Sequence, residues 1–300
     1  MLQREERQVV QCGREISREE IEQIRETVAT FGQLSRCELA LTVCEHLEWR
    51  TASGSNKVDA CLKLLEKLES QGVLRLPEKQ GRSQPVLRIP SITERTQPEA
   101  EITGSLSDIG PVKLRIVADR EERGLWNEFV SRYHYLGYKK PFGCQLRYFI
   151  ESERAKLGCL LFSGSAKSIG IRDRWIGWSD GERLRNLGWV VNNTRFLIFP
   201  WVRVRYLASH VLGEATRRIR GDWQERWDYR PVLMETFVDP RYFEGTCYRA
   251  SNWLYLGMTS GEGLVRAGKS YTTSPKKMFV LPLVEDFRSV LCSSARVVRP

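Results

Sequence analysis

The segment from residue 189 to residue 257 limits the fold of this chain more than any other part of the sequence. It opens with WVVNNTRFLIFP (189–200), an almost wholly apolar or β-branched run that predicts a buried strand. Apolar residues then recur every four positions over 207–223, as on one face of a helix. A second apolar run between two prolines (231–240) predicts another buried strand, and the aromatic-rich segment after it predicts a final helix ending at Gly257. Two such strands joined by one helix should be parallel neighbours with a right-handed crossover.

The N-terminal part, residues 1–90, has the pattern of a winged helix. Helical periodicity covers 16–33, a capping box at Ser35 opens a second helix, and a third begins near Lys57. The following segment predicts a two-stranded wing around Gly81. In that arrangement Lys57, Lys63 and Arg82 are candidate DNA contacts. Winged helices also dock proteins, and the net charge of −3 over residues 1–70 argues against strong phosphate binding by the whole surface.

The charge of the chain is concentrated after a polar, turn-rich segment that predicts a linker at 91–110. Residues 111–300 contain 32 Lys and Arg against 19 Asp and Glu, a net charge of +13. A strongly basic domain of this kind predicts a polyanionic partner, and DNA is the most common one.

Composition excludes several other classes. No apolar run is long enough to span a membrane and the N-terminus is too polar for a signal peptide, so we expect a cytoplasmic protein without membrane contact. The eight cysteines form no CxxC pair and the chain has only three histidines, which argues against a zinc finger.

Within the basic domain, a strand and a helix lead to a Tyr-His-Tyr-Leu-Gly turn, and two apolar runs then predict an antiparallel hairpin. An insertion of 168–186 follows. It interleaves aromatic and basic residues, a composition that suits stacking on unpaired bases with neutralisation of phosphates. A lid anchored by its tryptophans is the alternative. The candidate contacts are Arg172, Arg174, Trp175 and Trp178.

The predicted order of helix, antiparallel hairpin, parallel crossover and closing YRASNWLYLGM resembles the GNAT acetyltransferases. At the level of sequence, RYHYLGY, FGCQLRYFI, RDRWIGWS, VVNNTRFLIFPWV, RPVLMETFVDP and GTCYRASNW resemble the DruA family of the Druantia anti-phage systems, over residues 14–283. The two resemblances imply a mixed α+β or α/β architecture in which the winged helix precedes a GNAT-like mixed-sheet domain. They also imply a role in phage defence or mobile-element biology, with a helicase or other defence proteins as partners.

The GNAT resemblance would place a cofactor phosphate at the turn that precedes the helix of the crossover. Acetyltransferases have a Gly-rich turn there, whose backbone N–H groups hold the diphosphate of acetyl-CoA. This chain has Pro200 to Tyr206 without a glycine, so the sequence argues against acetyl-CoA. Arg203 and Arg205 could instead bind phosphate through their side chains.

Polar residues inside the buried strands are the candidate catalytic groups. Glu235 lies in the middle of the second strand, Asp239 at its carboxyl end, and Asn193 in the first strand. One hypothesis is that these three converge on Mg²⁺ or Mn²⁺ and polarise a phosphodiester bond. The alternative is that Glu235 forms a structural bridge with Arg195, which is otherwise a candidate DNA contact.

Two further residues could take part in chemistry. His134 lies between two tyrosines and is either a packed structural group or a general base. Tyr248 is either core or, by the GNAT resemblance, a general acid. The sequence thus predicts a cytoplasmic defence protein that binds DNA and is a candidate metal-dependent nuclease. An acyltransferase and a non-catalytic DNA-binding adaptor are the alternatives.

Overall fold

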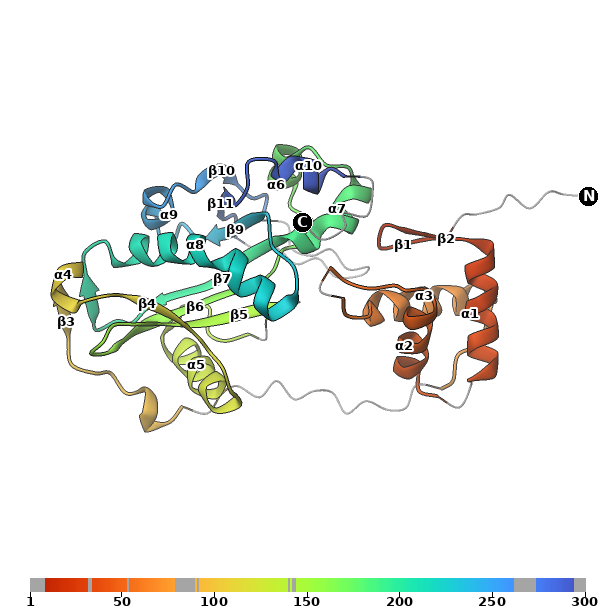
Figure 1. Ribbon diagram of the computed structural model, residues 1–300, viewed down its shortest axis with the longest axis horizontal. Coiled ribbons are helices and arrows are strands. Elements are labelled where there is room, and N and C mark those ends of the chain that lie inside the picture. Colours follow the sequence, from red (N-terminus) through yellow and green to blue (C-terminus); the bar gives the residue numbers. More distant parts are fainter. Residues whose placement is uncertain are drawn as a thin grey trace, which may run out of the picture. The chain divides into compact units, whose positions relative to one another are not determined.

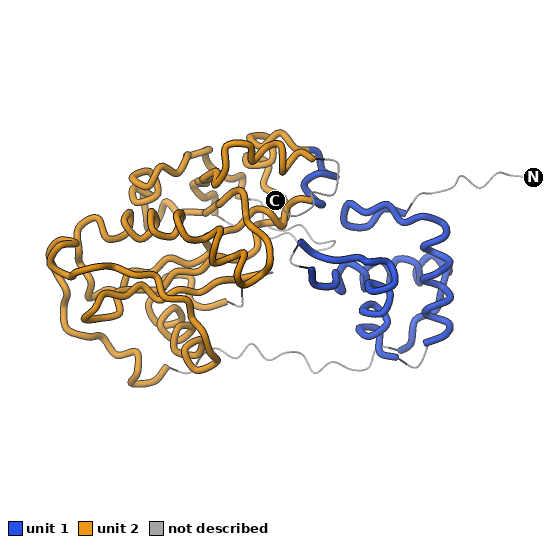
Figure 2. The backbone as a smooth tube through the Cα atoms, in the orientation of Figure 1, with its two compact units in different colours: residues 1–87, 179–185, 294–296 blue, residues 88–178, 186–293, 297–300 orange. Residues whose placement is uncertain are grey.

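The computed structural model describes residues 9–31, 34–52, 54–78, 90, 92–139, 141, 144–261 and 274–293. The chain forms two compact units, drawn in different colours in Figure 2. The first unit contains residues 1–87, 179–185 and 294–296, and the second contains the remainder.

The first unit has the three helices that the sequence predicts, preceded by a short hairpin. Its elements are β1 (Val9–Gln11), β2 (Arg14–Ile16), α1 (Arg18–Thr30), α2 (Arg36–His46) and α3 (Val58–Ser70). The capping box of α2 is confirmed: the Ser35 hydroxyl accepts from the Glu38 N–H, and the Glu38 carboxylate accepts from the Ser35 N–H. The wing falls mostly on residues 79–89, outside the described residues, so the winged helix and the role of Arg82 stay predictions.

The second unit is built on a seven-stranded mixed sheet with the strand order β10-β11-β9-β7-β6-β5-β4. Its strands are β4 (Lys113–Ile116), β5 (Gln145–Glu151), β6 (Lys156–Gly164), β7 (Val190–Ile198), β9 (Leu233–Val238), β10 (Leu254–Met258) and β11 (Lys277–Pro282). The β5–β6 hairpin is antiparallel and β7 and β9 are parallel, both as predicted. The mixed-sheet α/β fold expected for this domain is therefore confirmed.

Two long helices lie on opposite faces of this sheet, α5 (Arg120–Tyr133) and α8 (Leu207–Trp227) (Figure 1). Neighbouring residues of β5 contact both helices, since side chains alternate along a strand. Phe149 packs edge-on against Phe129 of α5, whereas the Tyr148 hydroxyl donates to Asp222 of α8. The shorter helices of this unit are α6 (Gly170–Ile176), η2 (Leu187–Trp189), α9 (Thr246–Ala250) and α10 (Phe287–Leu291). Helix α7 (Asp180–Asn186) belongs mostly to the first unit.

The segment predicted as a linker, 91–110, instead carries short elements of the second unit. They are η1 (Glu94–Thr96), β3 (Ile102–Gly104) and α4 (Leu106–Ile109), and β3 pairs in parallel with β8 (Val202–Val204). Near η1, Thr93 and Thr96 donate hydrogen bonds to the buried carboxylate of Glu128 on α5. The polar composition of the segment reflects these bonds rather than freedom of the chain.

The final helix ending at Gly257 is a wrong prediction, because the chain turns after α9 and continues as the edge strand β10. Asn252 has a φ of 64°, a left-handed conformation that ends a right-handed helix. Tyr255 then pairs with Phe279 of β11. None of the described helices is both long and apolar enough to cross a membrane.

Candidate ligand site where two parallel strands separate

The parallel strands β7 and β9 separate halfway along their length. Their pairing runs from Val190 opposite Leu233 to Asn193 opposite Thr236 and stops there. On its other edge β7 has a bulge at this point, because Asn193 lies opposite Phe162 while Arg195 lies opposite Leu161. A bulge bends the strand that carries it. A cavity of about 370 Å³ lies between the separated halves of the two strands.

Three hydroxyl or amide side chains form a hydrogen-bonded group in this cavity. The Tyr248 hydroxyl donates to Asn193 Oδ1 over 2.7 Å, and the Thr236 hydroxyl donates to the Asn193 carbonyl over 3.0 Å. Asn193 Nδ2 donates to the carbonyls of Leu161 and Arg195, which fixes the orientation of the amide. Burial raises the pKa of Tyr248, so its hydroxyl is protonated at neutral pH. Two of the predicted catalytic residues are thus brought together.

His134 also lines the cavity, together with its neighbour Tyr135. Its Nδ1 accepts a hydrogen bond from the Leu136 N–H over 3.1 Å. Burial, with a further contribution from the nearby Arg195 guanidinium, lowers the pKa of His134 to about 4. The imidazole is therefore neutral at pH 7, and with Nδ1 as acceptor the proton is on Nε2.

Three exposed aromatic residues lie together at the cavity: Tyr135 and Phe243 line it, and Tyr242 packs against Tyr135. Tyr242 is 57% exposed and Phe243 is 56% exposed, and their ring centroids lie 4.7 and 5.5 Å from that of Tyr135. The guanidinium of Arg241 lies 5.6 Å from the Tyr242 ring centroid. We call Tyr135, Tyr242 and Phe243 the aromatic rim.

The N-terminus of α8 adjoins the cavity through Ala208, which lines it. Tyr206, the N-cap residue, has a φ of 62° and makes no side-chain capping bond. Such left-handed geometry is usual for glycine and uncommon for tyrosine. Arg203 and Arg205 are exposed on the same turn, and Arg203 forms an exposed ion pair with Glu101.

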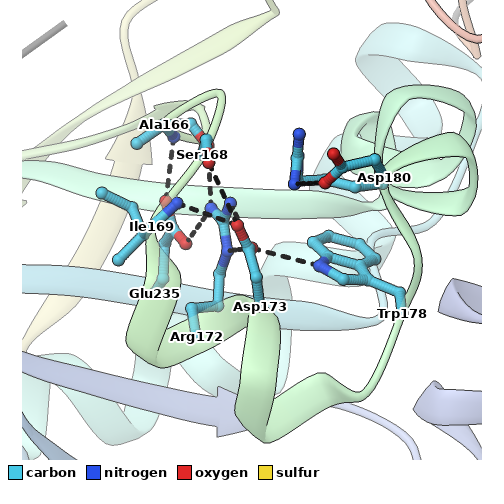
Figure 3. A network of polar contacts seen from close by, with 9 residues as sticks. Ala166, Ser168, Ile169, Arg172, Asp173, Trp178, Asp180 and Glu235 are labelled. Carbon is cyan, nitrogen blue, oxygen red and sulfur yellow. Dashed lines mark hydrogen bonds and ion pairs between the residues drawn. The ribbon is translucent and has the colours of Figure 1, made fainter.

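Glu235 is not bridged to Arg195, and it does not line the cavity. Its carboxylate accepts from Arg172 Nη1 over 2.8 Å and from the Ala166 N–H over 3.0 Å (Figure 3). Both side chains of this ion pair are 0% exposed. Burial raises the pKa of Glu235, and Arg172 opposes that rise. Arg195 instead donates to the carbonyls of Gly137 and Thr194.

Asp239 also forms an ion pair with an arginine, Arg241. Arg241 donates two hydrogen bonds to its carboxylate, and these bonds lower the pKa of Asp239 to about 2. Asp239 lies four positions after Glu235 along extended chain, which places their Cα atoms about 13 Å apart. Within the described part of the chain, no group of three His, Cys, Asp or Glu side chains could hold a metal ion. A Mg²⁺ or Mn²⁺ centre at Glu235 and Asp239 stays a prediction, and this arrangement does not favour it.

The insertion that includes α6 is packed rather than presented to solvent. Arg172 is fully buried, and Trp178 is 7% exposed with its indole N–H donating to Asp173. Trp175 stacks on Phe287 at a centroid separation of 5.2 Å. Only Arg174 of the four predicted contacts is exposed, which corrects the prediction for Arg172 and Trp178 and favours a tryptophan-anchored segment.

In the first unit, Lys57 is half-buried at the N-cap of α3 and Lys63 is exposed on that helix.

Sequence reasoning missed the aromatic rim and Thr236. The sequence contains two aromatic pairs, Tyr133 with Tyr135 around His134, and Tyr242 with Phe243 directly after the Asp239-Pro240 turn. The second pair lies in a turn that follows the buried strand β9, and such turns are candidates for ligand contact because they meet at one edge of a sheet. The first pair lies at the C-terminal end of α5 and has no such signal.

Comparison with solved structures finds distant likenesses, among them three to acyl-transferring enzymes. Aminoglycoside acetyltransferase AAC(6')-Ib, solved with coenzyme A and kanamycin, is 12% identical, covers 57% of this chain and 95% of its own, and has a TM-score of 0.38. A chimera of the spermidine N-acetyltransferase SpeG from Vibrio cholerae and hSSAT is 10% identical with the same coverages and a TM-score of 0.36. FeeM, an N-acyl amino acid synthase from uncultured soil microbes, is 13% identical, covers 60% and 94%, and has a TM-score of 0.34. Likenesses this distant carry no argument about what this chain binds.

Comparison with curated proteins gives no significant match. Comparison with protein families gives a match, and the matched residues include most of the second unit. The family described as Druantia protein DruA matches residues 67–273, more than half of the 300-residue chain. The match contains both separated strands, the cavity residues and the packed insertion, and the chain belongs to the DruA family.

Proposed function

We propose that this protein acts in anti-phage defence by binding DNA through its second unit. The observation that carries the proposal is that three arginines lie close in the chain to residues that line the cavity. Arg195 lies between two cavity-lining residues, Arg205 lies three residues before Ala208, and Arg241 lies two residues before Phe243. Glu244 is the one carboxylate among the described residues that line the cavity, and Lys277 neutralises it.

Two further observations support DNA as the ligand. Residues 111–300 have a net charge of +13, and a polyanion is the partner that such a charge attracts over the longest distance. Membership of the DruA family connects the chain with the Druantia defence systems. Arg203 and Arg205 are exposed at the N-terminus of α8, where a phosphate would also be attracted by the helix dipole.

The test is a salt titration of the full-length protein with fluorescein-labelled single- and double-stranded DNA, followed by anisotropy. We expect the affinity to fall steeply between about 50 and 200 mM salt, because counterions released from the phosphates drive binding. The double substitution Arg203→Glu and Arg205→Glu should weaken binding to every sequence. It should also reduce the salt slope by about 1 for each phosphate that these arginines no longer neutralise.

The matched control is Arg226→Glu, an exposed arginine on the last turn of α8. It lies about 30 Å from the N-terminus of this 21-residue helix. Binding that is unchanged in the double variant, or weakened equally by the control, would contradict a DNA surface at the cavity end of α8.

A second candidate function is acyl transfer, the alternative that the GNAT resemblance raised. It is favoured by one observation: the uncapped N-terminus of α8 and the protonated Tyr248 hydroxyl meet at the same cavity. Calorimetry with acetyl-CoA decides between the functions of the cavity. The bulky turn from Pro200 to Tyr206 predicts no binding; measurable binding that is lost in Ala208→Trp would favour the acyltransferase.

Metal-dependent nicking is the finer hypothesis from the sequence, and it is tested with the same labelled DNA in the presence of Mg²⁺ or Mn²⁺. We do not assign metal binding or DNA cleavage to Glu235 and Asp239, because each carboxylate already forms an ion pair with an arginine. Binding without cleavage would favour an adaptor that recruits a helicase or nuclease.

A further inference from the structure

We infer that the cavity between β7 and β9 receives one unpaired base of single-stranded DNA, with a preference for adenine or cytosine. This inference rests on the proposed DNA binding and names the part of the DNA that enters the site. It is carried by the shape of the cavity, by the aromatic rim and by the hydrogen-bonding groups at its floor.

The cavity and its rim have the form that an extruded base requires. Its volume of about 370 Å³ is at the lower end of the range for small-molecule pockets, about 300 to 1,000 Å³. Its walls are mainly apolar, with Phe196, Phe237 and Val238 among them. The aromatic rim is exposed, and aromatic side chains in this position stack on unpaired bases of any sequence.

The floor provides hydrogen-bond acceptors rather than donors. The Tyr248 hydroxyl donates to Asn193 Oδ1 over 2.7 Å, and the Thr236 hydroxyl donates to the Asn193 carbonyl over 3.0 Å and, at the longer distance of 3.5 Å, to the Tyr248 oxygen. A hydroxyl oxygen has two lone pairs, so each of the two oxygens retains at least one for a ligand. An exocyclic amino group is a hydrogen-bond donor that fits such a floor.

The wall provides a complementary donor. With Nδ1 accepting from the Leu136 N–H, neutral His134 carries its proton on Nε2. Adenine and cytosine each present an amino donor next to a ring-nitrogen acceptor on the Watson–Crick edge. Thymine presents carbonyl acceptors and a ring N–H instead, which leaves the acceptors of Tyr248 and Thr236 without an amino partner.

The test uses full-length protein and labelled strands of abasic sugar phosphates in which only the central position varies and is adenine, cytosine, thymine or a further abasic sugar. Anisotropy at fixed salt gives the four affinities. We expect adenine and cytosine to bind more tightly than thymine, and the abasic strand to bind roughly 5- to 150-fold more weakly than the adenine strand, the range for one stacked base. Replacing the adenine with fluorescent 2-aminopurine should give a change in emission on binding.

Two substitutions separate stacking from recognition. Phe243→Ala should weaken binding of the adenine strand but not of the abasic strand, and Tyr255→Ala is the control. Tyr255 is 41% exposed on β10 and does not line the cavity. Tyr248→Phe keeps the ring and removes the acceptor oxygen, so it should reduce the preference for adenine over thymine with little change for thymine.

The outcomes distinguish this inference from the function on which it rests. Equal affinities for all four strands, with steep salt dependence, would overturn the base site and leave DNA binding in place. Absence of any DNA binding would overturn both. Displacement of the 2-aminopurine signal by acetyl-CoA would assign the cavity to the acyltransferase and likewise overturn the base site.

Discussion

The ion pair between Arg172 and Glu235 stabilises the second unit, and Glu235 does not line the cavity. Both side chains are fully buried, and the carboxylate also accepts from the Ala166 N–H. Asp173 forms a further ion pair with the same guanidinium. A buried pair of this kind is tolerated when its hydrogen bonds are satisfied, but removal of one partner leaves a charge in a medium that solvates it poorly.

Glu235→Gln should therefore lower the free energy of unfolding by roughly 3–5 kcal/mol, because Arg172 would lose its fully buried counter-charge. Denaturant titration measures the change. Glu214→Gln is the control in the same unit, since its partner Arg217 is 64% exposed and such pairs contribute about 0–1 kcal/mol. A Glu235→Gln protein as stable as the control variant would refute the structural role.

The sequence could identify Glu235 as buried and paired, but not its partner. Asn192 is the residue opposite Glu235 on β7, and Arg195 lies further along, beyond the bulge. The true partner comes from α6, 63 residues earlier in the chain, and no local pattern connects the two positions. For the same reason His134, Asn193 and Tyr248 could each be named in advance, while the cavity that brings them together could not.

At the scale of elements, the close approach of β6 and β7 explains a glycine near the start of the buried strand β6. Gly158 lies opposite Ile198, and a Cβ atom at this position would overlap the Leu197 carbonyl oxygen. Leu197 and Ile198 both line the cavity, so the geometry of this strand pair also positions one wall of the site.

Gly158→Ala should destabilise the second unit by more than about 1 kcal/mol, since either strand must shift to relieve the overlap. Gly124→Ala is the comparison: this glycine is in α5 with open space around its missing Cβ, so the substitution should stabilise the helix by about 0.5–1 kcal/mol. Thermal unfolding of both variants measures the effect, and equal melting temperatures would contradict the close approach.

The long elements with a clear period were predictable, and the short ones were not. Strands β7 and β9 could be predicted because burial on both faces gives nearly continuous apolar runs. Helix α8 could be predicted because its apolar residues recur every four positions. The closing segment was misread because its aromatic residues suit a helix or an edge strand equally well, and the left-handed turn at Asn252 decides between them. The segment 91–110 was misread because its polar residues bond to partners that are distant in sequence.

At the scale of the whole molecule, the hydrogen bonds of Thr93 and Thr96 to Glu128 show that the second unit begins before residue 111. Glu128 is 6% exposed, and its carboxylate accepts from Thr93 and Thr96. Burial opposes ionisation of Glu128, but the hydrogen bonds from Thr93 and Thr96 outweigh burial and lower its pKa, which keeps this group charged. Strand β3 adds the pairing with β8 just before the N-terminus of α8.

A fragment of residues 88–300 should therefore be more stable than one of residues 111–300, although the shorter fragment contains the whole seven-stranded sheet. Removal of Thr93 and Thr96 leaves Glu128 buried without its donors, a loss of roughly 1–3 kcal/mol for each unmade bond. Melting temperatures of the two fragments at neutral pH test this. Equal values would show that the segment before residue 111 does not contribute to the unit.

The buried pair of Arg172 and Glu235 also has an evolutionary consequence. Substitution of Arg172 alone leaves the buried Glu235 carboxylate without its ion-pair partner, and substitution of Glu235 alone leaves Arg172 with only Asp173. Two apolar residues in place of the pair can be neutral or stabilising. Natural variants that survive selection should therefore change both positions or neither. Among relatives of this chain, the packed insertion and strand β9 are expected to be inherited as one module, joined by a pair of covarying sites 63 residues apart.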